Sequence, residues 1–243
     1  MSNFQKVLEV PSNGYFGGPK EVTMRGITTN EEKMIYTATD FSFIKQLIKS
    51  CCIEPKNLDV NKLHPNDLVY LVFALREMTF GATYPQSVVC PHCGFKQDVD
   101  IDITKMEYDI LDLDSLDEKL EVHLPASGDS VKLKLMSQGE IDDIEKEVKR
   151  GAEKGKIKDP DGWLFLKKFA GVIDTVNGKP FDTEADKINY VRNMSMRDSN
   201  KINKQLNEIK FGMNQMLDFT CARCHEEMEV KGYMSPEFFH PDE

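Results

Sequence analysis

The chain lacks long hydrophobic runs. Its 243 residues contain no uncharged stretch of about 20 residues, the length that a membrane-spanning helix requires. The first residues, MSNFQKVLEVPSNGYFGG, contain no apolar run of signal-peptide length. We therefore expect a protein that stays in the cytoplasm, or in whatever assembles there, without a membrane partner.

An excess of positive charge is also missing. The 31 Lys and Arg residues face 41 Asp and Glu residues, which gives a formal net charge of -10. Nucleic acids and anionic lipids are polyanions, so the molecule as a whole repels them. We expect neither DNA nor RNA to be its main partner.

Recognisable catalytic motifs are absent as well. There is no P-loop, no G-x-G-x-x-G, no nucleophile elbow and no H-E-x-x-H, and the five histidines are scattered along the chain. Acidic pairs are common, but on amphipathic helices such pairs usually form the solvent-facing side. The sequence therefore predicts that the protein is not an enzyme.

Apolar residues, in contrast, make up 40% of the chain, enough to bury a sizeable core. The first 30 residues are typical of a β-hairpin-like arm with a turn at 11–14. Period-two alternation predicts a strand over 99–103, and a hairpin turning at 127–129 follows it. Capping residues, apolar spacing and Gly stops predict helices over 40–52, 64–81, 138–151, 163–173, 182–194 and 195–212.

Four of the six cysteines form two C-x-x-C pairs, Cys90 with Cys93 and Cys221 with Cys224. Each pair lies between short strand-like segments, which is typical of a zinc ribbon, in which four thiolates surround one Zn²⁺. Between the inner cysteines lie 127 residues, whereas a free-standing ribbon has about 15 to 20. The metal is therefore expected to act as a structural clasp.

Other interpretations of the cysteines remain open. The pairs could be independent thiols, one of them redox-active, although neither has a thioredoxin-like βαβ context. A catalytic zinc is less favoured, because four thiolates leave no position for water. His92 and His225 adjoin the knuckles and are interpreted as neighbours of the metal site. Cys51 and Cys52, at a predicted helix end, are interpreted as buried thiols.

These elements predict an α+β fold. Two β-hairpins carrying the Cys-x-x-Cys knuckles would form a split zinc ribbon that closes a mainly helical insertion, and an N-terminal β-arm with two helices would precede it. The predicted domains are an N-terminal region over 1–83, a zinc ribbon with the C-terminal tail over 84–105 and 216–243, and the insertion with its hairpin over 106–215.

Zinc ribbons often bind nucleic acid, so a nucleic-acid-associated regulatory protein is the alternative function. The strand after the first knuckle carries Asp98, Asp100 and Asp102, and the second knuckle precedes Glu226, Glu227 and Glu229. Such a surface would repel phosphates. The basic segment KEVKRGAEKGKIK is interpreted as a solvated helix end and loop.

Both ends of the chain resemble a known family. The segment LEVPSNGYFGGPKEVTMRGITTNEEKMI and the ending MSMRDSNKINKQLNEIKFGMNQMLDFTCARCHEEMEVKGYMSPEFFHP resemble the baseplate proteins of contractile-tailed, T-even-type bacteriophages. The resemblance implies a baseplate hub component or hub assembly factor without enzymatic activity. Its partners would be other hub or tail proteins, in the host cytoplasm during assembly or in the virion.

Two segments are candidates for contacts with such partners. One is the N-terminal turn with Pro11, Tyr15 and Phe16, and the other is the C-terminal SPEFFHP with Phe238 and Phe239. Adjacent aromatics near a chain end are typical of anchors for a partner. The alternative is that Phe238 and Phe239 fold back over the protein's own core.

Overall fold

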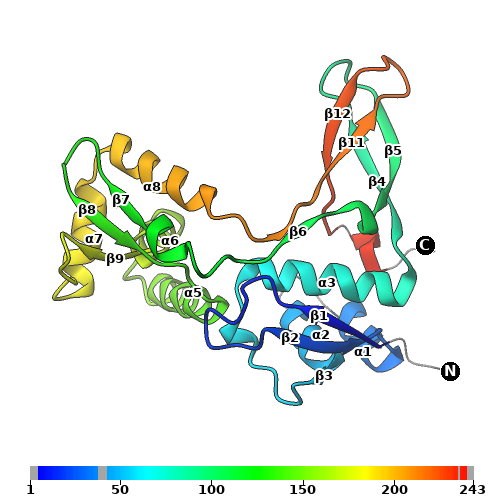
Figure 1. Ribbon diagram of the computed structural model, residues 1–243, viewed down its shortest axis with the longest axis horizontal. Coiled ribbons are helices and arrows are strands. Elements are labelled where there is room, and N and C mark those ends of the chain that lie inside the picture. The colour runs from blue at the N-terminus through cyan, green and yellow to red at the C-terminus, as the bar shows by residue number, and fades with distance from the viewer. Residues whose placement is uncertain (1–4, 38–42, 235, 240–243) are drawn as a thin grey trace.

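The computed structural model describes residues 5–37, 43–234 and 236–239. Figure 1 shows an elongated molecule, in which one end holds the N-terminal sheet and a long central helix. From this end two β-hairpins project side by side, and the opposite end holds the middle of the chain. The mixed α and β character predicted from the sequence is confirmed.

The N-terminal part combines a small antiparallel sheet with three helices. The sheet has the order β1-β2-β3. Its strands are β1 (Gln5–Glu9), β2 (Glu21–Arg25) and β3 (Cys52–Glu54), and the helices are α1 (Thr29–Tyr36), α2 (Ile44–Cys51) and α3 (Pro65–Phe80), with the 3₁₀ turn η2 (Val60–Lys62) before α3. Neither α1 nor β3 was expected. The helix that the sequence predicts over 40–52 corresponds to α2, and its candidate N-cap Asp40 lies outside the described residues.

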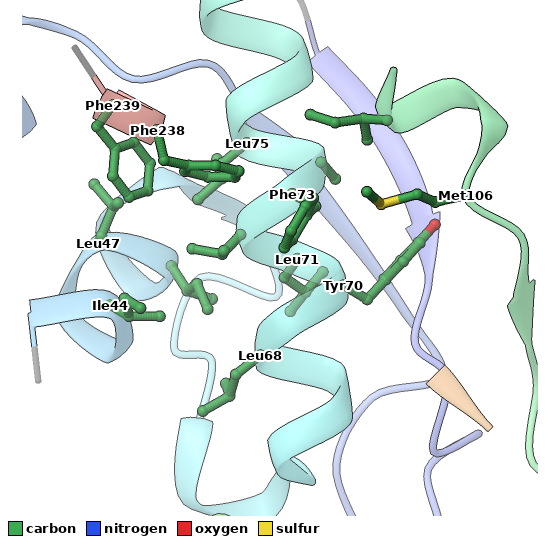
Figure 2. Close-up of a cluster of buried hydrophobic side chains, with 14 of the residues drawn as sticks. Ile44, Leu47, Leu68, Tyr70, Leu71, Phe73, Leu75, Met106, Phe238 and Phe239 are labelled. Carbon is green, nitrogen blue, oxygen red and sulfur yellow. The ribbon is translucent and has the colours of Figure 1, made fainter. Parts of the chain in front are cut away.

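Helix α3 is the centre of the first hydrophobic core. Pro65 occupies its first turn, and the Nδ1 of His64 accepts a hydrogen bond from the backbone N–H of Asn66, which caps the helix. The residues from Leu71 to Leu75 are all buried, so the helix is covered on every side. Figure 2 shows Ile44, Leu47 and Phe239 on one side of α3, and Tyr70 and Met106 on the other.

Two β-hairpins follow the same design at distant places in the sequence. β4 (Thr83–Val89) pairs with β5 (Lys96–Asp102), and β11 (Met216–Thr220) pairs with β12 (Glu227–Lys231). The side chain of Gln86 joins them: its Nε2 donates to the Lys231 carbonyl, and its Oε1 accepts from the Tyr233 N–H. The segments before and after the middle of the chain are thereby held together.

The middle of the chain forms a unit of its own, entered and left through a two-residue ladder between β6 (Tyr108–Asp109) and β10 (Gly212–Met213). The 3₁₀ turn η3 (Ile103–Lys105) precedes β6. The unit contains a three-stranded sheet of order β7-β8-β9. Its helices come before β7, between β8 and β9, and after β9 in the sequence. These elements are α4 (Leu116–Lys119), β7 (Glu121–His123), β8 (Ser130–Leu133), α5 (Gln138–Glu153), α6 (Pro160–Gly171), β9 (Ile173–Val176), α7 (Glu184–Asn193) and α8 (Met196–Glu208).

The buried side chains form two clusters. The first contains residues between Leu8 and Met106 together with residues between Cys221 and Phe239. The second contains residues between Leu111 and Phe211. The N-terminal region and the two hairpins therefore share one core, although the sequence predicted separate domains for them. The exact domain boundaries stay a prediction.

The insertion touches the rest of the protein through specific polar contacts. The backbone N–H of Gln138, at the start of α5, donates to the Leu63 carbonyl over 2.7 Å. Nearby, the Lys45 ammonium pairs with the Asp142 carboxylate. At the ladder, the Asn66 amide donates to the Phe211 carbonyl. These contacts fix the insertion against the N-terminal part.

Candidate metal centre

The two knuckles have the same backbone geometry. In the first, the Cys90 N–H donates to the Phe95 carbonyl, and the Gly94 N–H donates to the Cys90 carbonyl. In the second, the Cys221 N–H donates to the Glu226 carbonyl, and the His225 N–H donates to the Cys221 carbonyl. Gly94 has a φ of 71° and His225, at the equivalent position, has a φ of 60°. The left-handed residue turns each loop back, so both cysteines of a pair face the same point.

The structure brings all four predicted cysteines together at the tips of the hairpins. The Sγ atoms of Cys90 and Cys224 lie 3.8 Å apart, as do those of Cys93 and Cys221. All four sulfurs lie within 4.8 Å of one another. A disulfide requires about 2.05 Å, so these are not bonded pairs. Four sulfurs at about 2.3 Å from a central Zn²⁺ would be about 3.8 Å apart in a tetrahedron, so the donor set fits such an ion.

The backbone also favours the charged form of one thiol. N–H groups of Cys224 and Arg223 point to the Cys221 sulfur and lower the pKa of this thiol to about 6. The Arg223 nitrogen is 3.4 Å from that sulfur. A cation would stabilise the remaining thiolates, because metal ligands must be deprotonated. The neighbouring sulfurs in turn raise the pKa of the Cys224 thiol, so in the absence of a cation the four thiols do not all ionise together.

Comparison with known proteins places this geometry in context. A family model described as T4 bacteriophage base plate protein matches residues 1–240. The chain belongs to this family. No curated protein and no solved structure matches the chain. Membership supports a tail component of the virion that interacts with other tail proteins, and it favours a structural role over an enzymatic one.

The surroundings of the cluster in this baseplate protein are partly apolar. Cys90 and Cys221 are buried, whereas Cys93 and Cys224 are half-buried. His92 and His225 are exposed, and neither belongs to the group of four. Among the residues that the structure describes, the four cysteines are the cysteine, histidine or acidic side chains whose arrangement could hold a metal ion.

The two remaining cysteines lie elsewhere. Cys51 is fully buried at the end of α2, and burial raises the pKa of its thiol to about 12. Cys52 is half-buried and begins β3. The prediction of buried thiols is thus confirmed for Cys51 and was too strong for Cys52, because the chain changes there from helix to an edge strand.

The N-terminal turn of the baseplate protein lies where its two cores meet. Pro11 is buried, and its carbonyl accepts a hydrogen bond from the Leu111 N–H. The half-buried Phe16 ring stacks on His64 at 5.8 Å between centroids, and His64 in turn contacts Phe211 at 4.7 Å. Tyr15 packs edge-on against Phe16 and remains 37% exposed. Most of this turn therefore makes contacts within the chain.

The C-terminal aromatics occupy the interior. Phe238, in the 3₁₀ turn η4 (Pro236–Phe239), is fully buried, and Phe239 is 4% exposed. The Phe238 ring lies 4.9 Å from Phe73 and 5.1 Å from Tyr84. In this structure the two rings fold back over the protein's own core, so they are not exposed anchors as one of the two interpretations expected. Their sequence position alone could not distinguish the alternatives.

The outer faces of the hairpins are acidic. Asp98 and Asp100 on β5 are exposed, as are Glu227 and Glu229 on β12. The register also places Asp218 directly opposite Glu229. Negative charge in these positions would repel a phosphate backbone. Separately, none of the helices in the described ranges is long and apolar enough to cross a membrane.

Proposed function

We propose that this protein is a baseplate hub component, or a factor that assembles the hub, and that Cys90, Cys93, Cys221 and Cys224 hold one structural Zn²⁺. The observation that carries the proposal is the four-sulfur cluster at the tips of two hairpins, in a chain of the T4 baseplate family. The protein would act by binding other hub or tail proteins, without catalysis, in the host cytoplasm during assembly or in the virion.

A structural role for the ion follows from its ligand set. Four thiolates complete a tetrahedral shell and leave no position for a substrate or water. The ion would connect two hairpins whose inner cysteines are separated by 127 residues, and closing so long a loop restricts the unfolded chain strongly. Zinc would therefore stabilise the platform on which partners dock, rather than contact them.

The exposed part of the N-terminal turn is our candidate contact. Tyr15 is 37% exposed, while Pro11 and Phe16 hold the turn against Leu111 and His64. A partner that binds Tyr15 would touch both cores at once. Truncation after Tyr233 would test the alternative segment: loss of stability matching the loss of partner binding assigns Phe238 and Phe239 to the core alone.

Elemental analysis tests the metal. We expect about one zinc per purified chain, and the same value for Cys52→Ser, which changes a thiol outside the cluster. Cys90→Ser should lose the metal. A zinc content far below one in the wild type, with all cysteines free, would contradict the proposal.

The hub assignment has a separate test. Antibodies raised against the protein should co-purify it with hub proteins from infected cells. Its presence in finished tails would identify a hub component, and its absence there an assembly factor. A nucleic-acid function would instead require binding to DNA or RNA that weakens steeply with salt, and the acidic hairpin faces count against it.

A further inference from the structure

The first strand of the N-terminal sheet has an open edge. In the order β1-β2-β3, β1 pairs only with β2. The Val10 N–H donates to the Lys20 carbonyl, and this bond fixes the alternation of the antiparallel ladder. The backbone groups of Lys6 and Leu8 therefore point towards β2, and those of Val7 and Glu9 point away from it. Within the described residues, no hydrogen bond satisfies the N–H groups of Val7 and Glu9.

A hollow with an apolar floor adjoins this edge. It has a volume of about 220 Å³ and lies between β1, α3 and the segment from η3 to β6. Its floor includes Leu8, Tyr70, Ala74 and Met106. Figure 2 shows Tyr70 and Met106 on the same side of α3. The space suits one or two aliphatic side chains that enter from an added strand.

Exposed apolar groups lie near this edge, Val7 on the face opposite the hollow and Tyr108 beside the hollow. Val7 is 63% exposed on the outer face of β1. The Tyr108 ring is tilted against that of Tyr70, with 4.6 Å between centroids, and Tyr108 is 41% exposed. On an added strand the apolar side chains would face the hollow and the free side of Tyr108, and the aliphatic stems of the side chains between them would cover Val7. Edge backbone, hollow and apolar groups thus lie within the reach of one extended segment.

The charges around the edge favour a basic segment. Glu9 lies on β1 itself and Glu77 lines the hollow, and the exposed Glu107 and Asp109 adjoin Met106 and Tyr108 in sequence, against Lys6 and Lys105. Lys6 is already paired with Glu77 over 3.1 Å. Charged side chains at an edge normally prevent uncontrolled pairing, so a partner must compensate for them. A segment with Lys or Arg between its apolar positions would do so.

We propose that β1 accepts, along its open edge, an extended segment of a partner protein with apolar side chains at alternate positions and basic side chains between them. The partner would bind by strand addition: its backbone hydrogen-bonds to Val7 and Glu9, and its apolar side chains enter the hollow beside Tyr70. This surface is distinct from the cysteine cluster, and the proposal does not depend on a bound metal.

The probe is an acetylated and amidated peptide, Lys-Val-Lys-Leu-Lys-Val-Lys, titrated into the full-length protein. We expect binding that slows hydrogen exchange at the Val7 and Glu9 amides, while Leu8, already bonded to β2, changes little. The matched peptide with Glu in place of Lys should bind at least about tenfold more weakly. Peptide binding that leaves the Val7 and Glu9 amides unchanged would overturn the proposal, and so would the absence of binding.

Two variants of the strand separate backbone pairing from side-chain contact. Val7→Pro removes an outward N–H and leaves the bonds to β2 intact, so it should weaken peptide binding by about tenfold or more. Val7→Thr keeps the N–H and should bind normally. If Val7→Pro folds and binds as the wild type does, the edge is not the site.

A test without mutation covers the case in which Val7→Pro does not fold. In a bound strand, every second peptide N–H faces β1 and the others face solvent. N-methylation of the residues that face β1 should abolish binding, and N-methylation of the others should leave it unchanged. Equal effects of the two sets of N-methylations would overturn strand addition. Sedimentation of the protein alone completes the test: self-association that protects the Val7 and Glu9 amides would assign the edge to a second copy of this chain, against the proposal.

Discussion

The two hydrophobic cores of this protein are assembled in different ways. The second is built from one continuous stretch, residues 111–211, which contains none of the six cysteines. The first joins residues before this stretch to residues after it, and it includes the cysteine cluster. A contiguous unit can rely on contacts that form nearby in sequence. A core made from both sides of an insertion gains more from a cross-link.

The buried polar side chains of the two cores also make different kinds of contact. In the insertion, the nearly buried Lys167 ammonium pairs with Glu147 and Glu184, and Asp198 on α8 accepts hydrogen bonds from the Ala126 and Ser127 N–H groups. In the first core, the buried Arg76 guanidinium donates to the carbonyls of Gly81 and Thr83 and lies over the Phe80 and Tyr84 rings. It thereby fixes the corner between α3 and the first hairpin.

The largest effect should come from the cluster. Cys90→Ser removes one of four ligands, and we expect loss of metal and about 5 kcal/mol lower unfolding free energy for the first core. Hydrogen exchange should accelerate in the hairpins and remain slow in the insertion. The matched variant Cys52→Ser should keep both the metal and the stability. Equal loosening of both cores would refute the proposed difference between them.

Removal of a buried ring should be the next largest effect. Phe238→Ala leaves a cavity among Phe73, Tyr84 and Phe239, and it should lower the unfolding free energy by about 4 kcal/mol. Phe165→Ala in the insertion removes a ring that is 64% exposed. This variant should change the unfolding free energy by no more than about 0.5 kcal/mol. Denaturant titration measures both. A small effect at Phe238 would contradict its place in the core.

The junction between the cores should respond to pH. Burial lowers the pKa of His64 to about 4 from its ordinary value of 6.5. The folded protein therefore resists protonation, so this contribution to stability is complete above pH 6.5 and is lost as the pH falls towards 4. We expect a loss of about 2 kcal/mol between pH 7.5 and pH 5.

The variant His64→Asn provides the control for this pH effect. Asn can accept the capping hydrogen bond from the Asn66 N–H, but it does not titrate in this range. Its unfolding free energy should therefore vary less with pH, as measured by denaturant titration at each pH. If both proteins lose the same stability between pH 7.5 and pH 5, another group is responsible.

An effect of about the same size is expected at the ladder that leaves the insertion. Gly212 has a φ of 92°, and a Cβ there would lie 2.7 Å from the Asn66 Cβ. Gly212→Ala should lower the unfolding free energy by about 2 kcal/mol. Gly178→Ala has a similar φ but open space around it, so only about 1 kcal/mol is expected. The difference between the unfolding free energies of the two variants, obtained from thermal unfolding, measures the cost of crowding Asn66 at the junction.

Local signals in the sequence were sufficient for several elements. Ser137 and Glu140 predicted the start of α5, and the structure forms their reciprocal capping hydrogen bonds. The same signature, Thr28 with Glu31, precedes α1. The sequence did not predict that helix, because its apolar spacing is weak. The structure agrees with this weak pattern, since Glu31 and Ile35 are the buried residues of the helix. Helix α6 also begins earlier than expected, because Pro160 follows the capping residue Asp159.

Contacts between residues far apart in the sequence were harder to predict. The spacing within each C-x-x-C pair indicated that the two pairs share one site, and the structure places their sulfurs together. No local pattern marks the ladder of β6 with β10, which has two residues on each side. The same applies to Pro11 and Phe16, whose partners Leu111 and His64 are defined only by the tertiary fold.

The long separation of the two knuckles has a consequence for the order of events during synthesis. A ribosome that adds about 5 to 20 residues per second needs roughly 6 to 25 seconds to pass from Cys93 to Cys221. During this interval the first hairpin exists with two thiols and no partner hairpin. The insertion, being contiguous, can fold within the same interval. The four-sulfur cluster can close only once Cys224 has been added, when the insertion is already complete, and the contacts of Phe238 with Phe73 and Tyr84 form after it.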